Sequence, residues 1–344
     1  MEIRFASVAD IRPLMTFMHE HWRAHHILSR NETLFRFDFQ EGERLNLAIA
    51  EQSGDIVGLF GFMKYNSLDE PDLAGSLWKV VDDRAPPMLG LQLRRFVMHH
   101  VPHRFFAAPG AGLQTRSIYH LLGMRWIEMD HFYLANPGIG TRRICRMSTP
   151  AALPLHVSPT RADEFREVPN GDDLRDFPFL RLRRTGPTKD WAYLRRRFFT
   201  HPVYRYRVFR LSCAGEPVNI VVCREVAHAG ARALRVVDFY GDQRHMPELV
   251  PELYELMHRE GFEYVDFVCA GFDPRDMLRA GWRRLDFDRD DVVVPNYFEP
   301  FVMSNVRVYA VADAHPEITA RLCRADGDQD RPNVDSVAAM SVAS

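Results

Sequence analysis

The sequence predicts an α/β (α+β) chain made of two tandem copies of one unit, each a mixed and mostly antiparallel sheet flanked by helices. Three observations lead to this prediction. Segments with strand-like and helix-like periodicity alternate along the chain. The same order of elements occurs twice, with a turn glycine and a closing glycine at similar spacing, Gly54 to Gly123 and Gly215 to Gly281. Between the copies lies a weakly periodic stretch rich in Pro, Arg, Thr and Ser.

The first copy opens with a strand at residues 1–7 and a helix at 9–25. That helix carries an apolar stripe at helical spacing, formed by Ile11, Leu14, Met15, Met18 and Trp22. A β-hairpin follows at 45–65, with its turn at Ser53-Gly54-Asp55. The remaining elements of this copy are strands at 75–81, 104–109 and 124–135 and helices at 88–101 and 114–122.

The second copy repeats this order with a hairpin at 210–223, strands at 234–240 and 263–270 and a helix at 247–261. In this alignment Val80-Val81-Asp82 corresponds to Val236-Val237-Asp238. The end of the chain is polar and rich in small residues, which is typical of disorder. We therefore expect a first domain at 1–140, a linker or crossover at 141–164, a second domain at 165–316 and a disordered tail at 317–344.

Composition and charge exclude several classes of protein. The formal net charge is −2, so a basic surface for nucleic acid is not expected. The sequence has no apolar run long enough to cross a membrane and no signal-peptide core at its start, so we expect no membrane insertion. Its 5 cysteines are widely spaced without a CxxC pair, which favours a reducing cytoplasm.

The order of hairpin, central strand, helix, strand, short helix and glycine-aromatic step resembles the GNAT acyltransferase superfamily. The stretch "SIYHLLGMRW" looks like that family's helix with its Tyr-x-x-Leu-Gly ending. A series of short motifs, "HILSR", "WKV", "LGLQL", "HPVYRYRVF", "VDFYG" and "PNYFEPFVMSN", is similar to the tandem-domain amino-sugar N-acyltransferases of bacterial surface-polysaccharide pathways, including those that act on dTDP-anthrose precursors.

This resemblance implies transfer of an acyl group from acyl-CoA, as acetyl-CoA or a short hydroxyacyl-CoA, to the amine of a nucleotide-linked amino sugar, with no metal. It implies that the first domain binds CoA through the central strand and the start of the next helix, where free amides attract phosphate. The residues at these positions are Trp78, Lys79, Val80, Met88, Leu89, Gly90 and Leu91. The sequence departs from the family's Gln/Arg-x-x-Gly-x-Gly/Ala loop, because Pro86 and Pro87 offer no N–H. An ordinary proline-initiated helix is the alternative.

In the second domain, Asp242 and Glu248 near the predicted helix start disfavour phosphate. We therefore expect that domain to have lost CoA binding and to hold the acceptor. By resemblance, Tyr119 is the candidate acid for the departing thiolate, and Asp82 or Asp83 would bind or deprotonate the amine. The alternatives are a packed helix aromatic and two solvated carboxylates.

The acceptor is expected to meet aromatic and polar side chains, since aromatic faces stack on sugars and bases. The candidates by resemblance are His26, Ser29, His201, Tyr204, Asn296 and Tyr297. The alternative for the last four is a rigid, aromatic-rich turn that packs one unit on the other.

Other functions remain open at this point. The stretch "MHEHWRAHHILSR" places His21 and His25 on one helix face, which is compatible with zinc, but Arg23 breaks an HExxH motif. A Fem-like aminoacyl or peptidyl transferase also pairs two such units, although the sequence has no basic stripe for its charged tRNA. A non-catalytic GNAT-like binding module is the third alternative.

Overall fold

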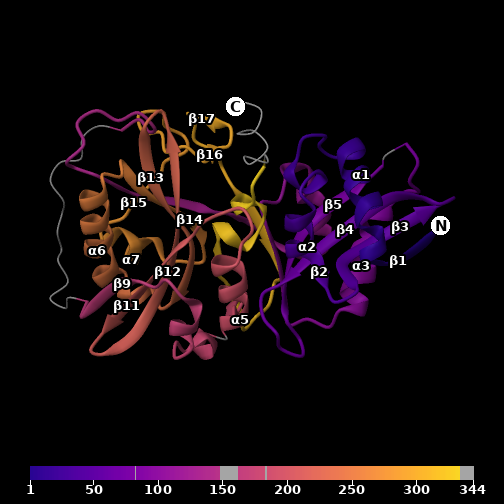
Figure 1. Cartoon of the computed structure of the whole chain (residues 1–344), viewed down its shortest axis with the longest axis horizontal. Helices are drawn as coiled ribbons and strands as arrows, with labels where there is room; N and C mark the ends of the chain where they lie inside the picture. The colour runs from indigo at the N-terminus through magenta and orange to yellow at the C-terminus, as the bar shows by residue number, and fades with distance from the viewer. Residues whose placement is uncertain (82, 148–161, 183, 334–344) are drawn as a thin grey trace.

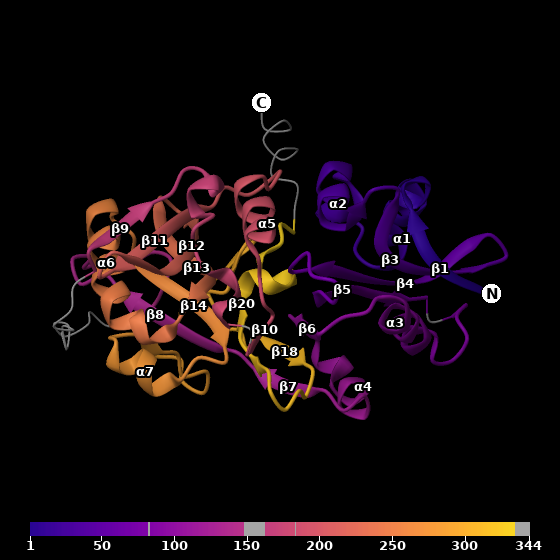
Figure 2. The ribbon, with the colours of Figure 1, turned by 90° about the horizontal axis from the view of Figure 1, so that it is seen from below.

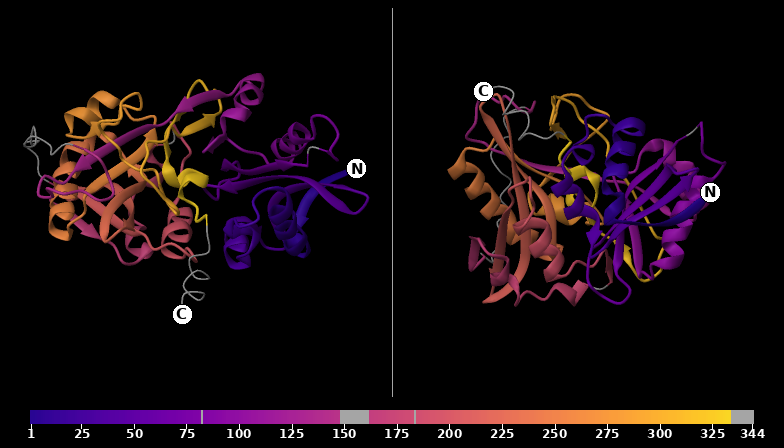
Figure 3. Two further views of the ribbon diagram at one scale, coloured as in Figure 1. Left: turned by 90° about the horizontal axis from the view of Figure 1, so that it is seen from above. Right: turned by 45° about the vertical axis from the view of Figure 1, so that its right-hand side comes forward.

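The computed structural model describes residues 1–81, 83–147, 162–182 and 184–333. The described chain folds into two 8-stranded mixed sheets, each flanked by helices, so the predicted fold class is confirmed. In Figure 1 the two units lie side by side, with the N-terminal unit on the right and the last segment of the chain, in yellow, between them. Figure 3 shows the same placement from two other directions. Among the described helices, none combines the length and apolarity needed to cross a bilayer.

The first sheet is covered by different helices on its two faces (Figure 2). α1 (Ile11–His21) and α2 (Glu32–Phe39) lie on one face, and α3 (Leu89–His100) and α4 (Arg116–Leu121) lie on the other. The strand order is β1 (Glu2–Ser7), β3 (Arg44–Gln52), β4 (Asp55–Lys64), β5 (Asp72–Val80), β6 (Phe105–Pro109), β18 (Tyr309–Ala312) and β7 (Arg125–Glu128), with β2 (Gln40–Glu41) paired to β3. α2 was absent from the sequence prediction, and its start is fixed by Asn31, whose side chain accepts a hydrogen bond from the amide of Leu34.

The second sheet has the same plan. Its strand order is β15 (Arg283–Arg284), β8 (Asp130–Ala135), β14 (Tyr264–Ala270), β13 (Ala231–Gly241), β12 (Glu216–His228), β11 (Arg207–Cys213) and β9 (Glu164–Glu167), with β20 (Leu322–Cys323) paired to β14. The helices of this half are α5 (Trp191–Leu194), α6 (Met246–Glu260) and α7 (Pro274–Arg279). Two small ribbons pair β10 (Thr185–Gly186) with β19 (Thr319–Ala320) and β16 (Tyr297–Phe298) with β17 (Phe301–Val302).

The two units exchange one strand. β8 leaves the first half of the chain and inserts between β14 and β15 of the second sheet. β18 leaves the second half and inserts between β6 and β7 of the first sheet. In Figure 2, β8 accordingly runs in magenta among orange strands, and β18 lies in yellow beside purple ones. A boundary at residue 140 therefore does not separate the two sheets, and the single strand predicted at 124–135 is two strands that belong to different sheets.

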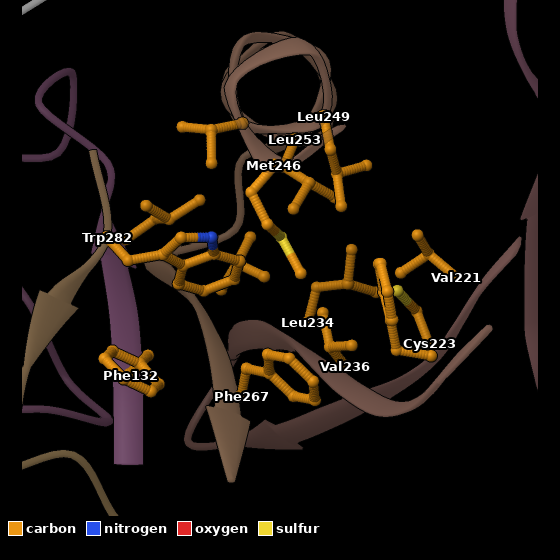
Figure 4. Close-up of a cluster of buried hydrophobic side chains, with 14 of the residues drawn as sticks. Phe132, Val221, Cys223, Leu234, Val236, Met246, Leu249, Leu253, Phe267 and Trp282 are labelled. Carbon is orange, nitrogen blue, oxygen red and sulfur yellow. The ribbon is translucent and has the colours of Figure 1, made fainter. Parts of the chain in front are cut away.

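The exchange is reinforced by side-chain packing. Figure 4 shows Phe132 on the exchanged strand in one apolar cluster with Trp282 and Phe267 of the second half. Met246, Leu249 and Leu253 from α6 cover this cluster. Each of these side chains is less than 6% exposed, and burial of a large apolar side chain stabilises a fold by about 1.5–3 kcal/mol.

The segment expected to begin a disordered tail is instead structured up to Asn333. It forms β19, β20 and two short 3-10 turns at Arg324–Asp326 and Asp328–Asp330. Leu322, Ala325 and Asp330 are buried. The prediction of disorder is therefore wrong for residues 318–333. The polar groups of this segment form hydrogen bonds inside the molecule, for example from Arg224 to Asp330 and from Arg331 to Asp38. Residues 334–344 lie outside the described residues.

Both central strands carry a bulge where they leave their parallel neighbour. β5 pairs with β6 only over Asp72–Ala74, and its register with β4 then shifts between Gly75 and Trp78. β13 pairs with β14 only over Leu234–Val236, and its register with β12 shifts just before Asp238. In each central strand the bulge thus follows directly where the parallel pairing ends. Bulges re-aim side chains and commonly lie beside functional sites.

Candidate functional site

The divergence of β5 from β6 opens a gap in the first sheet. A cavity of about 580 Å³ lies along it, which we call the strand-end cavity. Its walls come from the end of β5, the start of α3 and the α4 region, and they include Trp78, Lys79, Val80, Gln114 and Thr115. A strand edge without a neighbouring strand offers amides and carbonyls to an extended ligand arm.

Most residues predicted to hold CoA line this strand-end cavity. Met88, Gly90 and Leu91 join the three β5 residues in its wall. Leu89 is different: its side chain is only 1% exposed within the core and its amide donates to the Pro86 carbonyl. The expected cradle of four amides is therefore reduced, because the proline turn itself uses one of them. Gly90 and Leu91 belong to the first turn of α3, where helix geometry leaves amides without intrahelical partners.

Gly90 is required by its contact with Trp78. A Cβ atom at Gly90 would lie 2.8 Å from Nε1 of Trp78. The indole therefore packs directly on the first turn of α3, and this contact shapes the wall shared by strand and helix.

A second cavity of about 430 Å³, the central cavity, adjoins the first. The two share Trp78, Gln114 and Thr115 as lining residues. Beyond them the central cavity passes between the two units, and residues from both halves of the chain line it. An elongated ligand in the strand-end cavity would therefore bring one end into the central cavity.

Tyr119 lies close to the junction of the two cavities. It extends from α4 into the lining of the central cavity and is 5% exposed. Its ring contacts Trp78 edge-on at 5.6 Å between centroids. Burial raises the pKa of its hydroxyl to about 12, so the group keeps its proton at neutral pH. Tyr119 can therefore donate a proton to a group at the junction.

Asp83 does not reach either cavity. It lies exposed in the turn after β5, and it is not among the residues that line the two cavities. The structure places Asp83 outside the central cavity, because β5 lines that cavity from Gly75 to Trp78 and not at its C-terminal end. Asp82 lies outside the described residues.

Four of the six predicted acceptor residues line the central cavity: His26, Tyr204, Asn296 and Tyr297. Ser29 does not line it, because its hydroxyl donates to the carbonyl of His26 at 2.7 Å and ties the loop together. His201 is also outside the lining, and it stacks on Tyr204 with ring planes at 17°. These two residues support the cavity wall from behind.

The ring of His26 has a defined tautomer. Its Nδ1 accepts a hydrogen bond from the amide of Leu28 at 3.2 Å, so the proton of the neutral ring is on Nε2. Burial, with the charges of Arg331 and Arg23, lowers its pKa to about 3. His26 is therefore a hydrogen-bond donor toward the cavity and not a base.

Except for Glu299 in the motif "PNYFEPFVMSN", sequence reasoning missed the charged groups of the central cavity. Two carboxylates, Glu299 and Asp328, and the guanidinium groups of Arg224, Arg235 and Arg331 line it. Arg235 donates to the Asn296 carbonyl at 2.8 Å and so fixes the segment that carries Tyr297 and Glu299. Glu299 accepts from the Tyr204 hydroxyl at 3.1 Å. The signal of the missed groups was weak, because Arg224 and Arg235 lie in the apolar strands β12 and β13, and Asp328 and Arg331 lie in the presumed tail.

In the second unit the equivalent gap is occupied by the chain itself. β20 pairs with β14 through Cys323 opposite Cys269, just where β13 has diverged. The backbone is so close there that a Cβ atom at Gly271 would lie 2.0 Å from the Ala320 carbonyl oxygen. β20 therefore fills the gap on the β14 side, whereas a separate cavity of about 360 Å³ lies along Phe239–Asp242 at the end of β13.

Below β20, the ammonium group of Lys189 bridges two buried carboxylates. It contacts Asp238 and lies 2.6 Å from Asp326. Asp238, Asp326 and Cys323 form the single group of potential metal ligands among the described residues, and Lys189 stands between the two carboxylates. The N-terminal histidines are not brought together in such a group: His25 is exposed at the surface while His26 is buried.

Comparisons with known proteins define the fold class. No family model and no curated protein sequence matches the chain. Among solved structures, a GCN5-related N-acetyltransferase from Anabaena variabilis matches over 90% of this chain and 72% of that one, with a TM-score of 0.55 and 9% identity. A probable N-acyltransferase from Enterococcus faecalis matches over 90% and 71%, with a TM-score of 0.54 and 8% identity.

A third structure, the glucosamine N-acetyltransferase region of a fungal multi-domain β-N-acetylglucosaminidase, matches over 90% of this chain and 38% of that one. Its TM-score is 0.50 and its identity 10%. At these identities the likeness concerns the fold alone. The chain therefore has the mixed α/β architecture of GCN5-related N-acetyltransferases, in two tandem units.

Proposed function

We propose that the chain is an acyl-CoA-dependent N-acyltransferase that forms an amide on the amino group of a nucleotide-linked amino sugar, in a bacterial surface-polysaccharide pathway. One observation supports this most: the strand-end cavity and the central cavity share Trp78, Gln114 and Thr115, with Tyr119 beside their junction. A long donor and a separate acceptor can thus meet at one point. The GCN5-related fold of the solved neighbours is consistent with this chemistry.

The strand-end cavity suits the donor. The free edge of β5 can pair with the amides of a pantetheine arm. The first-turn amides of Gly90 and Leu91 can bind its pyrophosphate, helped by the positive end of α3. The thioester would then reach the junction, where the Tyr119 hydroxyl protonates the departing thiolate. Acetyl-CoA and short hydroxyacyl-CoA are the proposed donors.

The central cavity suits a polar and partly aromatic acceptor. Tyr297 and Tyr204 offer ring faces to a sugar or a base, and His26 and Asn296 offer hydrogen bonds to hydroxyl groups. One neighbour is named for acetylation of glucosamine, which is an amine on a sugar. An amino sugar attached to a nucleotide combines these features.

The test is a screen of dTDP- and UDP-linked amino sugars against acetyl-CoA and 3-hydroxybutyryl-CoA, with free thiol measured as product. Acceptor-dependent thiol release together with an amide product by mass spectrometry is expected. Calorimetry with the same acyl-CoAs provides the second readout. Binding without turnover for every acceptor would favour a binding module, and absence of any CoA binding would refute the acyltransferase proposal.

A further inference from the structure

The 3-10 turn Asp328–Asp330 brings a carboxylate from the end of the chain to the centre of the first unit. The backbone at Gly327 lies against the end of β6, so closely that a Cβ atom there would be 2.3 Å from the Pro109 carbonyl oxygen. This contact places Asp328 at the point where β5 and β6 diverge. The side chain lines the central cavity and is 36% exposed.

The carboxylate of Asp328 is held by one oxygen. Its Oδ1 accepts from the Ser76 hydroxyl at 3.3 Å and from Nη1 of Arg331 at 2.5 Å. Arg331 also donates to Ser76 at 2.8 Å and to Asp38 at 3.0 Å. Hydrogen bonds among Asp328, Ser76 and Arg331 therefore hold the Asp328 carboxylate in place. Oδ2 of Asp328 has no hydrogen-bond partner among the described residues. It is therefore available to a ligand.

Asp328 is also near the proposed acid. Its negative charge is among the causes, after burial, that raise the pKa of Tyr119. A carboxylate and a protonated phenol thus line the same cavity. The other carboxylate of the central cavity, Glu299, is bonded to Tyr204 on the second unit and lies on the acceptor side.

We propose that Asp328 is the catalytic base that receives the acceptor amine and takes its proton. This role rests on the function proposed above. The neutral amine attacks the thioester carbonyl carbon, a C–N bond forms, and the surplus N–H proton passes to Oδ2 of Asp328. The C–S bond then breaks, and the thiolate takes the Tyr119 proton. Amide and free CoA leave, and proton exchange with solvent restores both side chains.

The test uses the full chain with acetyl-CoA and the amino sugar that gives turnover in the screen. Asp328→Asn keeps the shape and the contact with Ser76 but removes the base. We expect kcat to fall by about 10²–10⁴-fold, while the KM for acetyl-CoA changes by less than about 3-fold. In Asp328→Ala, added formate should restore part of the rate, which a purely structural role does not predict.

Asp38→Asn is the matched control, because Asp38 shares Arg331 with Asp328 but does not line the central cavity. Thermal melting first establishes that each variant is folded. The proposal is overturned if folded Asp328→Asn keeps kcat within about 3-fold, if Asp38→Asn loses as much activity, or if formate restores nothing. An inactive wild type would refute the proposed acyltransfer itself, whereas an active wild type with active Asp328→Asn would refute only the role of Asp328.

Discussion

The ring of Tyr119 meets the ring of Trp78 edge-on, with centroids 5.6 Å apart and planes at 67°. This contact holds the phenol between β5 and the central cavity, where the acceptor is proposed to bind. Tyr119→Phe keeps the ring contact and removes only the hydroxyl. We expect kcat to fall by about 10²-fold with little change in the melting temperature, as measured by steady-state kinetics and calorimetry.

The wild-type pH profile provides an independent check on Tyr119. Because the pKa of Tyr119 is raised to about 12, ionisation of this group should not lower the rate between pH 7 and about 10. An alkaline loss of rate near pH 9 that disappears in Tyr119→Phe would contradict this assignment.

Gly90→Ala should weaken the binding of acyl-CoA. The added Cβ atom would lie 2.8 Å from Trp78 Nε1, so the indole must move and the strand-end cavity changes shape. We expect the Kd for acetyl-CoA to rise by about 10-fold or more in calorimetry, which corresponds to about 1.4 kcal/mol. Gly140→Ala, where nothing lies within 4 Å, is the control and should bind like the wild type.

Each chain should bind one acyl-CoA. β20 occupies the gap of the second unit, and Asp242 places a carboxylate at the start of the segment that leads into α6, where it accepts from the Arg244 amide at 2.9 Å. A pyrophosphate there would meet the negative charge of Asp242, and β20 already fills the gap beside β14. Calorimetric titration should give a stoichiometry near one. A second tight site that survives Gly90→Ala would contradict this prediction.

Acid should destabilise the fold through His26, which is buried, and His201, which is half-buried. Burial, as the largest cause, lowers the pKa of His26 and of His201 to about 3 from an unfolded value near 6.5. Between these values the unfolded chain binds more protons than the folded chain, so the unfolding free energy falls as pH falls from about 6.5 toward 3. Each group contributes up to about 1.4 kcal/mol per pH unit.

Urea unfolding at several pH values measures this dependence. His201→Gln should reduce the slope of unfolding free energy against pH in this window, and His25→Gln, at an exposed position, serves as the control substitution. An unchanged slope in His201→Gln would count against a neutral ring at this position.

The other N-terminal histidines should be dispensable. His21 and His25 do not line the central cavity, whereas His26 does. The double variant His21→Ala/His25→Ala should retain wild-type kcat/KM, and His26→Ala should raise the acceptor KM. Loss of activity together with loss of a bound metal in the double variant would revive a metal function for this stretch.

The repeated architecture could be predicted from the sequence alone. Turn glycines mark both hairpins, and Gly54 and Gly215 indeed have positive φ angles, at 89° and 77°. Periodicity also located β5 and α3, and hence most of the strand-end cavity. These features depend on local sequence, in which backbone geometry and burial leave a repeating pattern.

The central cavity depends instead on contacts between distant parts of the chain. Asp328 and Ser76 are 252 positions apart, and no periodicity links them. The segment around Asp328 is polar because its charged groups pair with Arg331 and Arg224, so composition alone made it resemble a disordered tail. The exchanged strands were missed for a related reason, since only Met129 separates β7 from β8 and no turn residue marks the boundary.

The exchange of β8 and β18 also sets the order of events during synthesis. Ribosomes make β6 and β7 long before β18 at Tyr309–Ala312 emerges. Until then β6 has an unpaired edge at the centre of the nascent first sheet, and such edges favour aggregation. That edge stays open while the second half is made. The first unit therefore completes its sheet only when nearly the whole polypeptide has been translated.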